Sequence, residues 1–212
     1  MSLNDFLREK GVSELEGNCD QIPAQKQHIA EICMNKNIKN ILEIGFNAGH
    51  SAEVILSANK NAKLTSFDLN VHSYAAIAKD YMDKKFPDRH VFIAGDSKET
   101  IPKHDKDAKF ECFFIDGGHD YETAKADIQN CSRLASPCAM VMMDDVVLPP
   151  VEGVEYSKGP TQAWIEAVNQ NLITSICHYK YGDTRGMAVG FYSYKEVVDV
   201  SKVPVFTTDS LE

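Results

Sequence analysis

The stretch that most constrains the fold is residues 41–51. Residues 41–44 are apolar apart from one acid and predict a buried strand, which Gly45 and Gly49 end. Residues 51–56 then predict the beginning of a helix. Glycine lets the backbone approach a ligand closely, and the free N–H groups at a helix start attract negative charge. Strand, glycine turn and helix start together predict a cradle for a nucleotide-like ligand.

Strand and helix patterns alternate along most of the chain. Strand-like runs occupy residues 40–44, 64–68, 90–94, 110–115 and 138–143, with helical patterns between them. Such alternation predicts a parallel sheet with helices on both faces. After a helix that opens at Thr161, residues 172–179 and 186–194 predict two strands joined by a turn. We therefore expect an α/β fold with a doubly wound sheet of seven strands, mostly parallel with an antiparallel C-terminal hairpin.

The length of 212 residues suits one domain. We expect N-terminal helices in residues 1–38, a core in residues 39–194 and a polar tail in residues 195–212. Residues 146–160 hold three prolines and two glycines and predict a long loop that covers the site.

Composition and charge narrow the classes of function. A net charge of -9 argues against a nucleic-acid surface, which needs clustered Lys and Arg. No stretch approaches the ~18 apolar residues of a membrane helix, and the N-terminus has no signal-peptide pattern. The expected protein is cytoplasmic and binds neither nucleic acid nor membrane. Six cysteines form no Cys-x-x-Cys pair, so we expect buried, reduced thiols at positions 19, 33, 112, 131, 138 and 177.

Acids recur where the predicted strands end. Because the carboxyl ends of parallel strands meet at one edge of a sheet, these side chains should share one ligand-binding rim. Turn and helix-cap preferences explain an acid at any single position, but poorly explain acids at five strand ends. The acids are Glu43, Asp68, Asp96, Asp116, Asp144 and Asp145.

Asp68 is the candidate ribose ligand. It follows Gly45 by 23 residues, near the spacing of about 20 found in nucleotide-binding folds. A carboxylate can accept hydrogen bonds from two vicinal hydroxyls at once. Glu43 is placed to orient the glycine turn or an amino group of the ligand, and Asp96 with Ser97 could bind an adenine edge.

Two motifs resemble those of a known family. Residues 42–52, Leu-Glu-Ile-Gly-Phe-Asn-Ala-Gly-His-Ser-Ala, resemble motif I of class I S-adenosylmethionine-dependent methyltransferases, in the form of the catechol O-methyltransferase-like branch. Residues 114–121, Phe-Ile-Asp-Gly-Gly-His-Asp-Tyr, resemble a motif of a group that includes sugar and macrolide O-methyltransferases. The resemblance runs from about Gln21 to Tyr194. It implies a Rossmann-like sheet and S-adenosylmethionine as cofactor.

The resemblance also assigns cofactor contacts. It puts Glu43, Gly45 and Gly49 beside the amino acid part of S-adenosylmethionine, Asp68 on the ribose, and Asp96 and Ser97 near adenine. The remaining expected cofactor contacts are Phe46, Asn47, Ser51, Leu69 and Asp116.

Metal-dependent members of the family hold a divalent ion with the acid after the fourth strand and a pair after the fifth. The matching residues are Asp116, Asp144 and Asp145, and Mg²⁺ suits them. Catechol-type enzymes have Asp-Asn at the pair, so Asp145 departs from that pattern and adds a carboxylate. His119 occupies the position of their catalytic lysine, as in the sugar-modifying group. We expect His119, with Asp116, to act in catalysis by deprotonating the acceptor.

The expected function is metal-assisted O-methylation of a small-molecule hydroxyl. Metal-independent methylation of another acceptor and cofactor binding without catalysis are the alternatives. A nicotinamide-dependent reductase is disfavoured because Gly-x-Gly-x-x-Gly is missing. His119 could also be a structural turn residue, and the acids could bind only water or the acceptor. The sequence leaves the acceptor and the oligomeric state open, and an oligomer is compatible with it.

Overall fold

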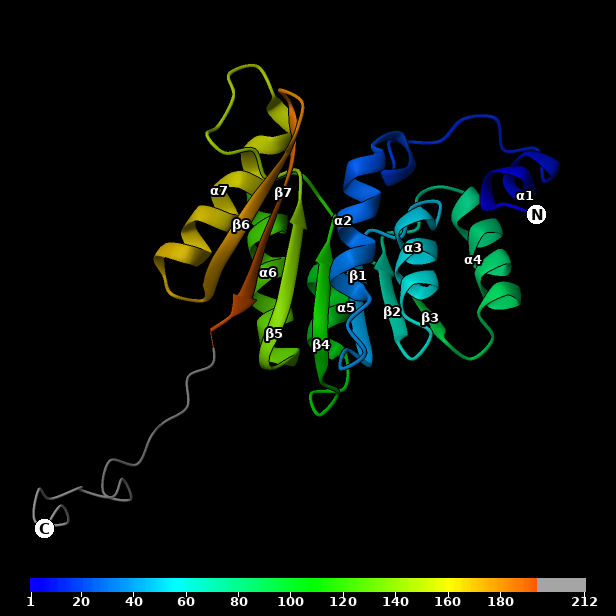
Figure 1. The fold of residues 1–212 in the computed structure, drawn as a ribbon, viewed down its shortest axis with the longest axis horizontal. Helices are drawn as coiled ribbons and strands as arrows, with labels where there is room; N and C mark the ends of the chain where they lie inside the picture. The colour runs from blue at the N-terminus through cyan, green and yellow to red at the C-terminus, as the bar shows by residue number, and fades with distance from the viewer. Residues whose placement is uncertain (194–212) are drawn as a thin grey trace, which may run out of the picture.

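A computed structural model describes residues 1–193 (Figure 1). In this part of the chain seven strands form one sheet in the order β3-β2-β1-β4-β5-β7-β6. The first five strands are mutually parallel, and β7 lies antiparallel between β5 and β6. The predicted doubly wound sheet with an antiparallel C-terminal hairpin is confirmed. The strands are β1 (Asn40–Ile44), β2 (Lys63–Asp68), β3 (His90–Ala94), β4 (Phe110–Ile115), β5 (Ala135–Asp144), β6 (Ile173–Tyr181) and β7 (Arg185–Tyr192).

Helices cover both faces of the sheet (Figure 1). One face carries α2 (Pro23–Cys33), α3 (His50–Ala58) and α4 (Tyr74–Lys85), with α1 (Leu3–Glu9) packed on α4. The other carries α5 (Ser97–Lys103), α6 (Tyr121–Leu134) and α7 (Glu155–Asn169). No helix in the described residues is long and apolar enough to cross a membrane.

Side chains that alternate along the strands pack into two separate hydrophobic cores, one on each face of the sheet. On β1, Ile41 packs under the helices of the first face and Leu42 under those of the second. On β4, Phe114 packs into the core of the first face and Phe113 into that of the second. A strand covered on both faces needs apolar side chains in both directions, which explains the almost unbroken apolar runs in the sequence.

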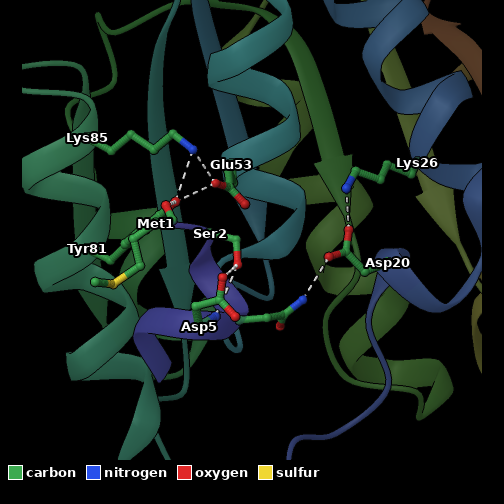
Figure 2. Close-up of polar contacts among 9 residues, drawn as sticks. Met1, Ser2, Asp5, Asp20, Lys26, Glu53, Tyr81 and Lys85 are labelled. Carbon is green, nitrogen blue, oxygen red and sulfur yellow. Dashed lines mark hydrogen bonds and ion pairs between the residues drawn. The ribbon is translucent and has the colours of Figure 1, made fainter. Parts of the chain in front are cut away.

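The N-terminal helix is tied to the core by polar contacts (Figure 2). The Tyr81 hydroxyl donates to the Glu53 carboxylate at 2.8 Å and lies 3.3 Å from the Met1 carbonyl oxygen. The Asn4 side-chain amide donates to the Asp20 carboxylate, at 3.2 Å, in the 3-10 helix η1 (Cys19–Gln21). These contacts hold α1 and η1 at the two ends of the segment 10–18, part of which lines the site described below.

The start of α7 differs from the sequence prediction. The helix begins at Glu155, whereas a loop was predicted through residue 160 and a helix from Thr161. Gly159 and Pro160 are buried inside it, and a Cβ on Gly159 would lie 2.2 Å from the His119 carbonyl oxygen. Glycine at this position therefore permits close packing against the loop after β4 and does not mark a turn.

The strand β5 also begins earlier than predicted, at Ala135 instead of Cys138. Cys138 has φ of 59° where the β4–β5 register shifts, and its side chain is exposed. The prediction of a buried thiol is wrong here because the backbone irregularity turns the residue outward. Cys177 is half-buried, and the other four cysteines are buried. Tyr194 and the tail 195–212 lie outside the described residues.

Candidate functional site

A cavity of about 770 Å³ lies at the carboxyl ends of the parallel strands. This volume is typical of a small-molecule site. The cavity wall includes seven of the predicted cofactor contacts, namely Gly45, Asn47, Asp68, Leu69, Asp96, Ser97 and Asp116. It also includes all four predicted catalytic and metal residues, Asp116, His119, Asp144 and Asp145.

The glycine turn after β1 brings two strand ends into direct contact. Gly45 has φ of +92°, and its N–H donates to the Phe67 carbonyl at 2.8 Å. A Cβ on Gly45 would lie 1.8 Å from the carbonyl oxygen of Asp116. Only glycine satisfies both the positive φ and this contact. The turn therefore fixes the backbone of Asp116 against the end of β1.

Asp68 is held between two loops. Its Oδ2 accepts from the Asn47 N–H at 2.8 Å, and its Oδ1 accepts from the Asn70 N–H at 2.6 Å. A carboxylate has about four acceptor positions, so two remain for a ligand. The residue links the glycine turn to the end of β2 and still faces the cavity.

Four predicted cofactor contacts do not line the cavity. Glu43 is fully buried and accepts from the hydroxyls of Ser51 and Ser66, both at 2.5 Å. Burial raises the pKa of Glu43 to about 7. Phe46 is buried, and Gly49 precedes α3 with φ of +80°. Glu43, Phe46, Gly49 and Ser51 shape the glycine turn from behind it.

Three ligand-type side chains converge on the cavity wall. Asp116, His119 and Asp145 each place one ligand atom within 4.8 Å of the others. His119 Nε2 lies 3.0 Å from Asp145 Oδ2. Within residues 1–193 this cluster contains two of the three predicted metal ligands and replaces Asp144 by His119.

The electrostatics of the acids reflect crowding in a buried site. Burial raises the pKa of Asp116 well above its usual range, and repulsion by Asp144 and Asp145 adds to this. Burial also raises the pKa of Asp144 to about 7, with the charge of Asp145 as the next cause. The hydrogen bond to Asp145 raises the pKa of His119 above its ordinary value. Burial and neighbouring negative charge therefore both disfavour the ionised forms of Asp116 and Asp144.

The donor set fits a divalent cation. Asp145 Oδ1 is buried and has no hydrogen-bond partner within residues 1–193. A cation would satisfy this oxygen and relieve the repulsion among the acids. Carboxylate oxygens suit Mg²⁺, Mn²⁺ and Ca²⁺, and an imidazole nitrogen suits transition metals.

Part of the cavity wall comes from residues that were not predicted to belong to the site. The residues are Glu16, Gly17, Asn18, Cys19, Gln25 and Arg185. The Asn47 side-chain amide donates to the Gly17 carbonyl at 3.2 Å, and His72 Nε2 lies 3.1 Å from a Glu16 carboxylate oxygen. No local motif marks this wall, because its residues reach the site through the tertiary fold. Gly117 and Gly118 also line the cavity and could have been found, since they lie inside the motif at residues 114–121.

Comparison with known proteins shows that this chain is similar to methyltransferases. Residues 42–146 match a family described as a methyltransferase domain. O-methyltransferase imqG of Aspergillus flavus is 23% identical over 152 residues, which are 69% of this chain and 60% of that protein. The chain thus spans less than two thirds of the length of this relative.

Solved structures show the same fold at low identity. An O-methyltransferase from Bacillus cereus in complex with S-adenosylhomocysteine matches with a TM-score of 0.68 and 16% identity, covering 90% of each chain. The O-methyltransferase TomG from Streptomyces achromogenes, involved in tomaymycin synthesis and in complex with S-adenosylmethionine, matches with a TM-score of 0.70 and 18% identity. The match covers 91% of this chain and 88% of TomG.

Proposed function

We propose that this chain, whose residues 42–146 match a methyltransferase domain, is a class I S-adenosylmethionine-dependent O-methyltransferase that methylates a hydroxyl of a small molecule with the help of a divalent ion. The observation that carries the proposal is the cluster of Asp116, His119 and Asp145 on the wall of the same cavity as Asp68. Acids and an imidazole at this place suit deprotonation of a hydroxyl next to a methyl donor.

Three groups of residues on the cavity wall would bind the three parts of the cofactor. Asp68 would accept from the ribose hydroxyls with the acceptor positions that its backbone contacts leave free. Gly45 and Asp116 would lie beside the amino acid part, and Asp96 with Ser97 beside adenine. The bound cofactor supplies a methyl group already activated on sulfur, so the protein needs chiefly to orient the acceptor.

His119 would act as the general base. Its Nε2 faces Asp145, which leaves Nδ1 to take the proton of the acceptor hydroxyl. The Asp145 carboxylate orients the imidazole and stabilises its protonated form. This contact raises the pKa of His119. The imidazole therefore becomes a neutral base at a higher pH than an ordinary histidine does.

Asp116, Asp144 and Asp145 would hold the ion, leaving His119 free for the proton. The ion would supply Lewis acidity that lowers the pKa of the hydroxyl. The cluster geometry offers His119 as the third ligand in place of Asp144, so the two roles of His119 need a direct test.

The test is formation of S-adenosylhomocysteine with a panel of catechols and sugars, with EDTA and then with Mg²⁺ restored. EDTA should abolish turnover and Mg²⁺ should restore it. Asp144→Asn should lower turnover sharply with cofactor affinity unchanged, while Glu122→Gln, an exposed acid on α6, should change nothing.

Binding of Mn²⁺, followed by electron paramagnetic resonance, separates the roles of His119. A His119→Ala variant that keeps the ion but loses turnover supports the base. Loss of Mn²⁺ binding in this variant would show that His119 is a ligand of the ion. Turnover indifferent to EDTA removes the ion from the proposal. Cofactor binding without turnover on any acceptor favours a non-catalytic binding protein.

A further inference from the structure

Arg185 reaches the cavity at its acidic end. The residue begins β7, and its side chain is 36% exposed. Its guanidinium carbon lies 5.3 Å from the ring centroid of Tyr156 at the start of α7. On another side, a Cβ on Gly17 would lie 3.2 Å from Arg185 Nη2. Contacts from α7 and from the N-terminal segment therefore hold the guanidinium in place on the cavity wall.

The guanidinium of Arg185 makes no hydrogen bond to the neighbouring Asp145 carboxylate. Arg185 Nη1 lies 3.6 Å from Asp145 Oδ1, which is beyond hydrogen-bond distance. Asp145 Oδ1 has no hydrogen-bond partner within the described residues, and Asp145 Oδ2 faces His119 at 3.0 Å. One carboxylate thus faces the Arg185 guanidinium with Oδ1 and the His119 imidazole with Oδ2. Arg185 therefore has N–H donors that can bind a ligand, and Asp145 neutralises its positive charge only in part.

The chemistry of this group selects a particular kind of ligand. A guanidinium presents a planar fork of N–H donors that matches a carboxylate with two parallel hydrogen bonds. The cation–π contact with Tyr156 restrains the guanidinium before a ligand arrives, which reduces the entropy lost on binding. Lys98 also lines the cavity, but it lies beside Asp96, so Arg185 is the cation that would attract an anion next to Asp145.

We propose that Arg185 selects an acceptor that carries a carboxylate close to the hydroxyl that is methylated. This inference rests on the proposed function and names its acceptor class. In the reaction the acceptor oxygen forms a bond to the methyl carbon as the sulfur–methyl bond breaks. The hydroxyl proton goes to His119, and the cofactor leaves as S-adenosylhomocysteine. The acceptor carboxylate stays unchanged on Arg185 and positions the hydroxyl.

The experiment compares two acceptors that differ only in charge, 3,4-dihydroxybenzoate and 3,4-dihydroxybenzamide. Each is titrated by calorimetry into the protein saturated with S-adenosylhomocysteine and Mg²⁺. We expect the acid to bind at least about tenfold more tightly than the amide, as charge-assisted hydrogen bonds predict. Arg185→Gln should remove this preference, and Arg185→Lys should keep only part of it because lysine lacks the fork.

Two controls make the result specific. Lys158→Gln changes a cation on α7 that pairs with Glu155 and does not line the cavity, and it should leave the preference unchanged. The affinity of Arg185→Gln for S-adenosylmethionine should equal that of the wild type. A loss of cofactor affinity in this variant would assign Arg185 to the carboxylate of the cofactor and overturn the proposal.

Equal binding of acid and amide by the wild type, or binding of neither, would also overturn it. The proposed function fails separately, through absence of S-adenosylhomocysteine formation on any hydroxyl. Equal methylation of both probes would refute the role of Arg185 and leave the proposed methyl transfer intact. A preference for the acid without turnover refutes only the proposed methyl transfer.

Discussion

Replacing Gly45 by alanine tests whether the glycine turn builds the cofactor end of the cavity. The new Cβ would lie 1.8 Å from the Asp116 carbonyl oxygen and 2.7 Å from its carbon, and contacts under 3.0 Å essentially never occur. The backbone of Asp116 must therefore retreat by more than about 1 Å, a displacement that can cost on the order of 100-fold in catalysis. The positive φ adds about 1–2 kcal/mol, and the clash a further ~1–3 kcal/mol.

The matched control is Gly11→Ala. Gly11 has φ of +83° but no atom within 4 Å of the added Cβ, so it carries the backbone cost without the clash. Denaturant unfolding should show a loss of about 1–2 kcal/mol for Gly11→Ala and about 2–5 kcal/mol for Gly45→Ala. Calorimetry with S-adenosylhomocysteine should show at least a tenfold weaker affinity for Gly45→Ala alone. Equal affinities in the two folded variants would refute the reasoning.

Three further outcomes are expected. Asp68→Ala should weaken S-adenosylmethionine binding by roughly 1.5–3 kcal/mol, measured by calorimetry, and unchanged affinity would exclude a ribose contact. Because the pKa of Glu43 is raised to about 7, the native state keeps a proton that the unfolded chain loses, so stability should fall as pH rises from 4.5 to about 7. Glu43→Gln should flatten this fall in thermal unfolding at pH 5 and pH 8, and identical slopes would contradict it. Limited proteolysis within residues 148–153 should harm acceptor binding more than cofactor binding if this loop is a lid, and equal protection with and without acceptor would argue against gating.

The parts of the fold that could be predicted from the sequence are those specified by local patterns. The strand before Gly45 is a run of apolar residues with a glycine directly after it, and both signals lie within a few residues. The acids at the ends of β2 and β4 could be placed on one rim, because parallel strands share the direction of their carboxyl ends. Strand pattern and topology together were enough to locate one side of the cavity.

The other side could not be predicted, because it depends on tertiary contacts. Arg185 joins Asp145 only because β7 inserts beside β5, and the sequence carries no local mark of that pairing. Gly159 looks like a helix breaker by its type, yet burial against the loop after β4 overrides that tendency. Glu43 lies next to the end of β1, close to the glycine turn, but points into the protein, since the faces of a strand alternate.

The position of β7 affects how the protein can be made on the ribosome. The edge of β5 stays unpaired while α7 and β6 are synthesised, and only the strand beginning at Arg185 fills the gap. An unpaired edge is a template for pairing with other chains, so nascent chains on crowded polysomes are exposed to aggregation during this interval. Slow translation after residue 144 would lengthen the exposure. Synonymous codons for residues 145–184 should therefore influence the soluble yield of this protein more than codons elsewhere in the chain.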